Sequence, residues 1–262
     1  MKNSNKASMA VVGGSGLERL LKEARQIRVG TPYGLPTTIS LGKIEEKTVA
    51  FIPRHSVGHT IPPHRVNYRA NIFALHTLGV ERVFATNAVG GINSNLKPGD
   101  LVIPHDFEDF TKLRKGTFYN SAPVIHVDMS KPYCPEIRSV IIKAARKIGE
   151  STLDEAVLAC TEGPRYETPA EVMMLRSLGC DIVGMTGLPE AVLARELEMC
   201  YASLCYVSNM AVGLQESQNA SDLTNIAEKK KVVIEQILKE AIASLPKARS
   251  CVCAHALEDA RL

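Results

Sequence analysis

Six short runs of apolar residues, each followed within two residues by glycine, proline or asparagine, constrain the fold of this chain most strongly. Each run is three to six residues long and rich in β-branched or small side chains, which is typical of buried strands. The runs cover residues 9–12, 48–52, 83–85, 101–103, 181–183 and 202–207. We therefore expect a sheet whose strands end in loops that turn closely.

Between these runs, apolar residues recur with the spacing of helices. The expected helices cover residues 67–79, 135–148, 168–179, 189–198 and 222–244. Thr168, followed by a proline and an acidic residue, is one clear helix start. Strands that alternate with helices predict one α/β domain with a central mixed sheet flanked by helices. We expect this domain to cover residues 9–250, between a flexible leader of residues 1–8 and a tail of residues 251–262.

Composition and charge exclude several classes of function. No apolar run approaches the roughly 18 residues of a membrane helix, and the N-terminus lacks a secretory pattern, so we expect a cytoplasmic protein that binds no membrane. The formal charge of +3 does not favour a nucleic-acid coat, although a local basic pocket for an anion remains open. His55, His59 and His64 lack an acidic or cysteine ligand nearby, so no metal site is expected.

Polar loops follow the apolar runs, and ligands of such sheets gather beyond the carboxyl ends of the strands. The glycines around Ser15 allow backbone N–H groups to approach an anion, although a plain tight turn explains them equally well. Arg54 and His55 follow the second run, and the planar guanidinium suits a phosphate oxyanion. The remaining loops cover residues 86–93, 162–168, 184–190 and 208–211.

These loops together contain an anion site, a flat aromatic surface and an amide and carboxylate pair. The corresponding residues are Ser15, Arg54, His55 and Thr186, then Tyr166, then Glu167 and Asn209. The sequence contains no Gly-x-Ser-x-Gly elbow and no cysteine in a clearly electropositive loop. It therefore does not indicate covalent catalysis. The pattern favours a reaction that depends on positioning and on charge.

Six stretches, taken in this order, resemble the trimeric purine nucleoside phosphorylases, in particular the methylthioadenosine/methylthioinosine phosphorylase branch. They are VVGGSGL (11–17), PRHSVGHTIPPHRVNYRANIFAL (53–75), TNAVGGIN (86–93), TEGPRYETPAEV (161–172), GMTGLPEAVLARE (184–196) and YASLCYVSNMA (201–211). The resemblance implies a single α/β domain whose mixed sheet forms a distorted barrel. It also implies phosphorolysis with inorganic phosphate as co-substrate, no metal or organic cofactor, and a homotrimer or a dimer of trimers.

The resemblance assigns roles to individual residues. It implies that phosphate is bound by Ser15, Arg54, His55, Asn87, Ala88 and Thr186. It implies that the nucleoside is bound by Tyr166, Glu167, Met185 and Asn209, and by His126 from the neighbouring subunit. Among these residues, the catalytic ones are expected to be His55, Glu167 and Asn209.

The hydrogen-bonding capacity of two side chains indicates which base is bound. Ionised Glu167 only accepts hydrogen bonds, so it suits the N1–H of a 6-oxopurine, and Asn209 can accept from N7–H and donate to O6. The relatives specific for adenine have an aspartate at the position of Asn209 and a small residue at that of Glu167. We therefore expect inosine-type rather than adenosine-type substrates.

The sugar pocket is less well defined by the sequence. The segment after Ser221 contains Leu223 and Ile226 but no histidine for a 5′-hydroxyl group. These apolar residues either surround a methylthio group or belong to the core face of a helix. We expect S-methyl-5′-thioinosine as substrate, with inosine and guanosine also possible. Three alternatives stay open: a methylthioadenosine phosphorylase, a nucleosidase that uses water, and a non-catalytic nucleotide-binding module.

Seven cysteines are spread through the chain, and two of them form a Cys-x-Cys pair near its end. We expect one disulfide bond between Cys251 and Cys253 and a second between Cys134 and Cys200. The alternative is that most of these cysteines are small buried apolar residues.

Overall fold

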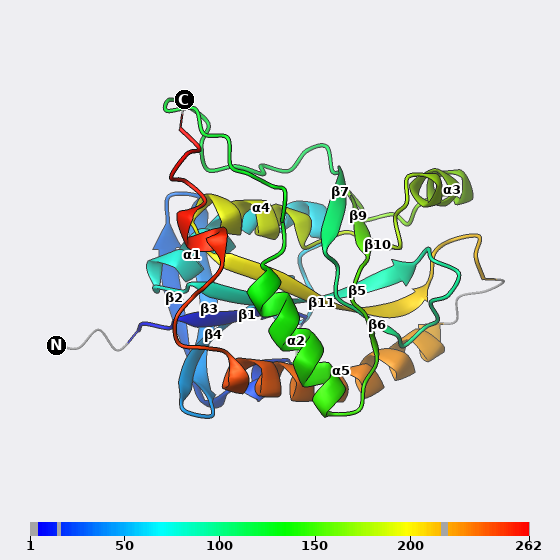
Figure 1. Cartoon of the computed structure of the whole chain (residues 1–262), viewed down its shortest axis with the longest axis horizontal. Helices are drawn as coiled ribbons and strands as arrows, with labels where there is room; N and C mark the ends of the chain where they lie inside the picture. The colour runs from blue at the N-terminus through cyan, green and yellow to red at the C-terminus, as the bar shows by residue number, and fades with distance from the viewer. Residues whose placement is uncertain (1–4, 15–16, 216–219, 262) are drawn as a thin grey trace.

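In the computed structural model, which describes residues 5–14, 17–215 and 220–261, one mixed sheet of eleven strands forms the centre of the molecule (Figure 1). The strands are β1 (Met9–Gly13), β2 (Lys22–Thr31), β3 (Gly34–Ile44), β4 (Lys47–Pro53), β5 (Arg82–Gly91), β6 (Leu101–Val102), β7 (Asp106–Phe110), β8 (Thr152–Leu153), β9 (Val157–Thr161), β10 (Ile182–Gly184) and β11 (Cys200–Met210). Each of the six apolar runs therefore corresponds to a strand, as predicted, although the runs 101–103 and 181–183 each extend one residue beyond theirs.

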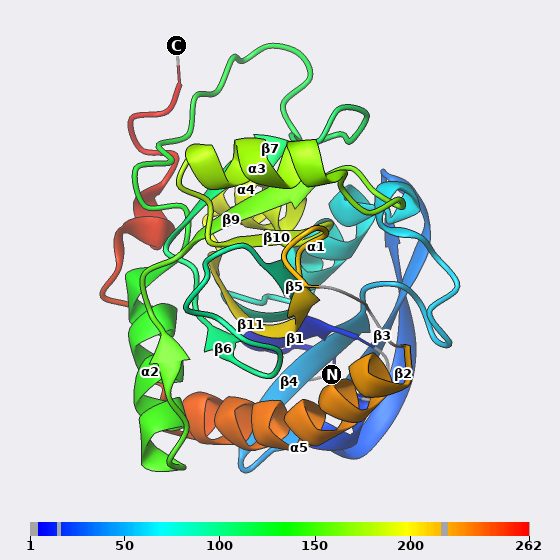
Figure 2. The ribbon, with the colours of Figure 1, turned by 90° about the vertical axis from the view of Figure 1, so that its right-hand side faces the viewer.

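Five α-helices within the described residues cover the sheet from two sides (Figure 2). They are α1 (Tyr68–Thr77), α2 (Pro135–Lys147), α3 (Pro169–Ser177), α4 (Leu188–Glu196) and α5 (Ala220–Ser244). Helices α2 and α5 share one hydrophobic core with the sheet, and α1 and α4 share another on its opposite face. The five expected helices are confirmed to within two residues at each end. None of the described helices has the length and apolar character needed to cross a membrane.

The parallel part of the sheet determines where a site can form. Strand β1 pairs in parallel with β4 and β5, and β11 pairs in parallel with β5. The carboxyl ends of these four strands therefore lie at the same edge of the sheet. This edge is where ligands of open α/β sheets bind.

The sheet is mixed and flanked by helices, as expected, but it does not close into a barrel. Its main path runs from β2 to β7, and in the described part of the chain these two outer strands do not pair with each other. Strand β11 pairs with β5 off this path, and β6 and β8 follow from it. A barrel requires its first and last strands to pair, whereas here the sheet branches at β5.

Two strands continue beyond their apolar runs, into residues that were expected to form loops. Strand β5 extends through residues 86–91, and β11 extends through residues 208–210. The polar side chains there belong to the sheet itself. The hairpin of β2 and β3 was not anticipated, because most side chains of β2 are exposed and polar.

The segments outside residues 9–250 contact the domain where the structure describes them. Ala7 is buried, and its N–H donates to the Leu78 carbonyl at 3.1 Å. Near the other end, Ala260 is buried, and its carbonyl accepts from the His126 N–H at 2.8 Å. Residues 1–4 of the expected leader lie outside the described residues.

Neither expected disulfide bond is present. All seven cysteines lie in the described residues, and none of them forms a disulfide bond. The four sulfur atoms of Cys134, Cys200, Cys251 and Cys253 gather in one cluster instead of two separate pairs.

A substitution at Gly42, which belongs to β3, tests the packing beneath the hairpin of β2 and β3. A Cβ atom added there would lie 2.7 Å from Leu21 Cβ and 2.8 Å from the Lys22 carbonyl oxygen. We expect Gly42→Ala to lower the free energy of unfolding by about 1–3 kcal/mol, because the neighbouring main chain must move. Gly30→Ala in β2 is the matched control, since nothing lies within 4 Å of its added Cβ. Chemical denaturation measures both variants, and equal losses would contradict the packing.

Candidate active site

A cavity of about 580 Å³ opens at the carboxyl edge of the parallel strands. Its volume lies within the usual range of small-molecule sites. Nine of the residues singled out from the sequence line it: Arg54, His55, Asn87, Ala88, Tyr166, Glu167, Met185, Thr186 and Asn209. The structure therefore brings together residues that follow β4, lie in β5 and β11, and precede α3 and α4.

Three of the predicted site residues are not placed in this cavity. Ser15 lies outside the described residues. Leu223 belongs to α5, but its side chain is also outside the described part. His126 is exposed in the segment between β7 and α2 and does not line the cavity of its own chain.

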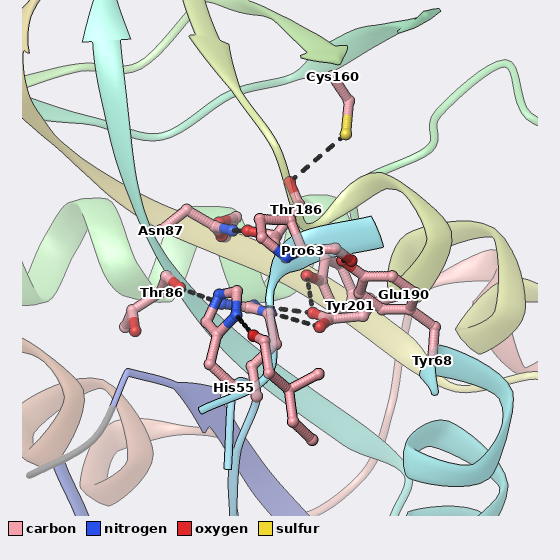
Figure 3. A network of polar contacts seen from close by, with 12 residues as sticks. His55, Pro63, Tyr68, Thr86, Asn87, Cys160, Thr186, Glu190 and Tyr201 are labelled. Atoms are coloured by element: carbon pink, nitrogen blue, oxygen red, sulfur yellow. Dashed lines mark hydrogen bonds and ion pairs between the residues drawn. The ribbon is translucent and has the colours of Figure 1, made fainter. Parts of the chain in front are cut away.

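Arg54 lies at the buried end of the cavity and is held by three hydrogen bonds. Its Nε and Nη2 donate to the two carboxylate oxygens of Glu190 at 2.5 and 2.8 Å, and its Nη1 donates to the Thr86 carbonyl at 2.8 Å. The Tyr201 hydroxyl donates to the same carboxylate at 2.7 Å (Figure 3). Both partners of the ion pair are buried, with Arg54 3% and Glu190 0% exposed.

The ion pair leaves Arg54 charged and partly free. Burial opposes the charged form, but the Glu190 carboxylate outweighs burial and raises the pKa of Arg54 above its ordinary value. A guanidinium has five N–H groups, and three are used by Glu190 and Thr86. The remaining two, one on each Nη atom, are available to an anion in the cavity.

A chain of hydrogen bonds orients Thr186 beside Arg54. The Ser203 hydroxyl donates to Asn87 Oδ1 at 2.6 Å, and Asn87 Nδ2 donates to Thr186 Oγ1 at 2.7 Å. Since Thr186 Oγ1 accepts this bond, its own hydrogen is free to point elsewhere. Thr186 therefore offers the cavity a hydroxyl donor, which suits an anion.

His55 lies beside Arg54 and offers an acceptor. Its Nδ1 lies 2.8 Å from the Ile61 carbonyl, which only accepts, so Nδ1 bears the hydrogen and Nε2 is free in the neutral ring. Burial lowers the pKa of His55 below its ordinary value, and the charges of Arg54 and His59 lower it further, although the Ile61 bond opposes them. The neutral form of His55 is therefore favoured.

Asn209 lies next to an irregularity of β11. The register of β11 against β5 shifts between Val207 and Asn209, so Ser208 is an extra residue in the strand. Asn209 Nδ2 donates to the Met210 carbonyl at 2.9 Å, and Ser208 Oγ donates to Asn209 Oδ1 at 2.6 Å. The amide is thereby fixed in orientation, with one lone pair on Oδ1 and one N–H still available.

The loop before α3 provides the more open wall of the cavity. Thr161 Oγ1 donates to Glu167 Oε1 at 2.6 Å, which leaves Oε2 as a free acceptor. Tyr166 is 59% exposed, so its ring is accessible to a ligand. Gly163 has a positive φ of 65°, and a Cβ there would lie 2.6 Å from Met185 Sδ, so glycine is needed at this position.

Sequence reasoning missed three buried residues that organise the site. Glu190 is in the first turn of α4, where an acidic residue is normally explained by the helix dipole. Both Tyr201 and Ser203 belong to β11, where Tyr201 directly precedes the apolar run 202–207 and Ser203 lies within it. Their spacing of two, which places both side chains on one face of the strand, was the available signal.

The described residues offer no metal ligand set in the cavity. The histidines at positions 55, 59 and 64 belong to no group of possible metal ligands within the described part of the chain. Instead, the rings of His55 and His59 stack with their centroids 4.4 Å apart.

Several known proteins are similar to this chain in sequence and in fold. A family model described as the phosphorylase superfamily matches residues 8–243. The chain is 50% identical over 256 residues to the probable S-methyl-5′-thioinosine phosphorylase of Methanothermobacter thermautotrophicus, covering 96% of this chain and 89% of that protein. It is 47% identical over 261 residues to the 6-oxopurine nucleoside phosphorylase of Pyrococcus furiosus, covering 96% of this chain and 98% of that protein.

A solved structure agrees with these sequence matches. The crystal structure of a methylthioadenosine phosphorylase from an Antarctic soil metagenomic library superposes with a TM-score of 0.92 at 38% identity, covering 98% of this chain and 93% of that chain. A family model that spans most of the chain, two relatives at 47% identity or more and a common fold all agree. The chain therefore belongs to the phosphorylase superfamily.

Proposed function

We propose that this protein cleaves 6-oxopurine nucleosides with inorganic phosphate, with S-methyl-5′-thioinosine as its main substrate and inosine and guanosine as further ones. The products are the free purine and the corresponding ribose 1-phosphate. One observation supports this reaction most: the buried guanidinium of Arg54 and the oriented amide of Asn209 line the same cavity. The names of the two relatives, one for methylthioinosine and one for 6-oxopurine nucleosides, support the substrate class.

Phosphate occupies the buried end in this proposal. The two free N–H groups of Arg54 and the hydroxyl of Thr186 donate to its oxygens, and the main chain at Ala88 and the side chain of Ser15 complete the site. Neutral His55 accepts at Nε2 from a protonated phosphate oxygen or a sugar hydroxyl. Phosphate is a co-substrate, and we propose that no metal or organic cofactor takes part.

The charge of the buried end of the cavity, where phosphate is proposed to bind, suits the reaction. Glu190 neutralises Arg54, so the site supplies directed donors with little net positive charge. Bound phosphate therefore keeps much of its negative charge. That charge stabilises the positive ribosyl group that forms as the bond from C1′ to N9 breaks.

The purine lies at the opposite end, between Tyr166 and the Asn209 amide. Asn209 Oδ1 accepts the hydrogen of protonated N7, which stabilises the departing base, and its free N–H donates to O6. The free Oε2 of Glu167 accepts from N1–H, directly or through water. An adenine would place a donor at position 6 and an acceptor at N1, leaving polar groups unpaired at a cost of about 1–3 kcal/mol.

The sugar lies between the two ends. Met185 contacts the ribose, and Leu223 lies near its 5′ substituent. Leu17, Tyr206 and Ile234 also line the cavity, and their apolar surfaces support a methylthio group at this position.

We further propose that the active unit is a homotrimer, alone or paired as two trimers. The exposed position of His126, outside the cavity of its own chain, is compatible with a role in the neighbour's sugar pocket. The sugar pocket of an isolated monomer would lack the His126 side chain of a neighbour, so the monomer would be poorly active. Oligomeric state is measured by light scattering alongside activity.

A substrate panel with and without phosphate tests the function directly. We expect phosphate-dependent release of hypoxanthine, with the highest kcat/KM for methylthioinosine among methylthioinosine, methylthioadenosine, inosine, guanosine and adenosine. Release without phosphate would identify a nucleosidase, and no release at all would identify a binding module. A preference for methylthioadenosine would favour the activity named for the metagenomic relative.

Arg54→Lys tests the anion site without leaving Glu190 unpaired in the core. Lysine keeps the charge but loses the planar fork, so we expect the KM for phosphate to rise roughly 10- to 100-fold. The KM for nucleoside should change less than about threefold, because the base contacts remain. Initial rates with each substrate varied in turn measure both constants. The reverse pattern would remove Arg54 from the phosphate site.

Asn209→Asp tests the choice of base. An ionised carboxylate accepts from both N7–H and N6–H of adenine but cannot donate to O6 of hypoxanthine. We expect the ratio of kcat/KM for inosine-type over adenosine-type substrates to fall roughly 10-fold or more. Asn95→Asp, at an exposed residue outside the cavity, is the control. An unchanged ratio in the Asn209 variant would contradict the assignment.

A further inference from the structure

The four clustered cysteines come from three separate parts of the chain. Cys134 is the N-cap of α2, Cys200 is the first residue of β11, and Cys251 and Cys253 flank the start of the 3-10 helix Val252–His255. Cys134 and Cys200 are completely buried, Cys253 is 1% exposed, and Cys251 is half-buried. No residue of this cluster lines the cavity, so the proposed function does not use it.

The sulfur atoms are arranged around one point. All four lie within 4.8 Å of one another, and those of Cys200 and Cys251 are 3.3 Å apart. A tetrahedral zinc ion with bonds of about 2.3 Å to four sulfur atoms places them about 3.8 Å apart. Two disulfide bonds would require close contact only within each pair, whereas a metal ion requires all four sulfur atoms to converge.

The position of Cys134 in the fold suits a thiolate ligand. Cys134 is at the N-terminus of α2, where the helix dipole stabilises a negative sulfur.

Arg195 lies close enough to the cluster for its charge to act on the Cys253 sulfur. Its side chain is 5% exposed and donates to the Lys131 carbonyl, and it forms no ion pair with a carboxylate of the described residues. A zinc ion with four thiolates has a net charge of −2. A buried guanidinium beside the cluster would offset part of that charge.

We propose that Cys134, Cys200, Cys251 and Cys253 bind one Zn²⁺ ion as four thiolates. Binding forms four Zn–S bonds and releases the remaining thiol protons to solvent, and no electron is transferred. The site is closed, with four protein ligands and no open position, so it is structural and not catalytic.

Such a site would fix the C-terminal segment in place. Cys251 and Cys253 belong to this segment, whereas Cys134 and Cys200 belong to the body of the domain. Further along the segment, Ala260 accepts from His126 N–H, and Arg261 forms a β-bridge with Ile125. The ion would therefore tie together α2, β11 and the stretch that includes His126.

Titration of the full-length protein with cobalt tests the site. The protein is reduced, freed of metal and kept without oxygen, and Co²⁺ is added as a spectroscopic substitute for Zn²⁺. We expect thiolate-to-cobalt charge-transfer bands and tetrahedral d–d bands that saturate at about one ion per chain and disappear when Zn²⁺ is added. Absence of these bands in the wild-type protein would overturn the proposal.

Variants and intact mass complete the test. Cys253→Ser and the less buried Cys251→Ser should each lose the tetrahedral spectrum or weaken cobalt binding at least ~10-fold. Cys180→Ser is the matched control, because Cys180 is buried in another part of the core and should bind cobalt like the wild type. A chain isolated without oxygen that has a mass about 4 Da below the fully reduced value would contain two disulfide bonds, which overturns the proposal.

Discussion

The buried ion pair between Arg54 and Glu190 is the interaction on which the rest of the site depends. An arginine this deep in the core is costly unless a carboxylate faces it, and removing either partner would leave an unpaired buried charge. Glu190 and the Thr86 carbonyl together bind three N–H groups of the guanidinium and leave two for a ligand. Because Tyr201 also donates to Glu190, the pair joins the end of β4, the first turn of α4 and strand β11. The proposed anion site and the packing of these elements therefore depend on the same ion pair.

The two proposed ends of the substrate differ in how firmly the protein holds them. Asn87 and Asn209 belong to β5 and β11, which pair along most of their length. Both amides are further fixed by hydrogen bonds to neighbouring groups, so the sheet sets the distance between the proposed anion site and the proposed base site. Tyr166, in contrast, is exposed on the loop before α3. In this arrangement rigid strands would hold the reacting atoms, and a nucleoside would enter past the exposed loop that contains Tyr166.

Much of this architecture could be predicted from the sequence, and the exceptions have physical causes. Helix starts were visible because caps and proline are local signals, and site residues were visible because they follow apolar runs. Glu190 was missed because an acidic residue at a helix start has an ordinary local explanation. Ser203 was missed because a serine within an apolar run is most simply interpreted as a small residue that fills space in the core. The sequence analysis expected Cys134 to pair with Cys200 and Cys251 with Cys253, but nothing in a single sequence indicated that the two pairs meet in one cluster.

The extra residue Ser208 in β11 limits the ways in which the preference for a base could change during evolution. Side chains alternate between the two faces of a strand, so inserting or deleting one residue there would turn Asn209 away from the cavity. Ser208 also donates to the Asn209 amide, so removing it would release that side chain as well. Divergence toward another purine should therefore proceed by exchanging side chains at constant length. Gene duplicates with altered specificity would keep this strand in register and differ at single codons.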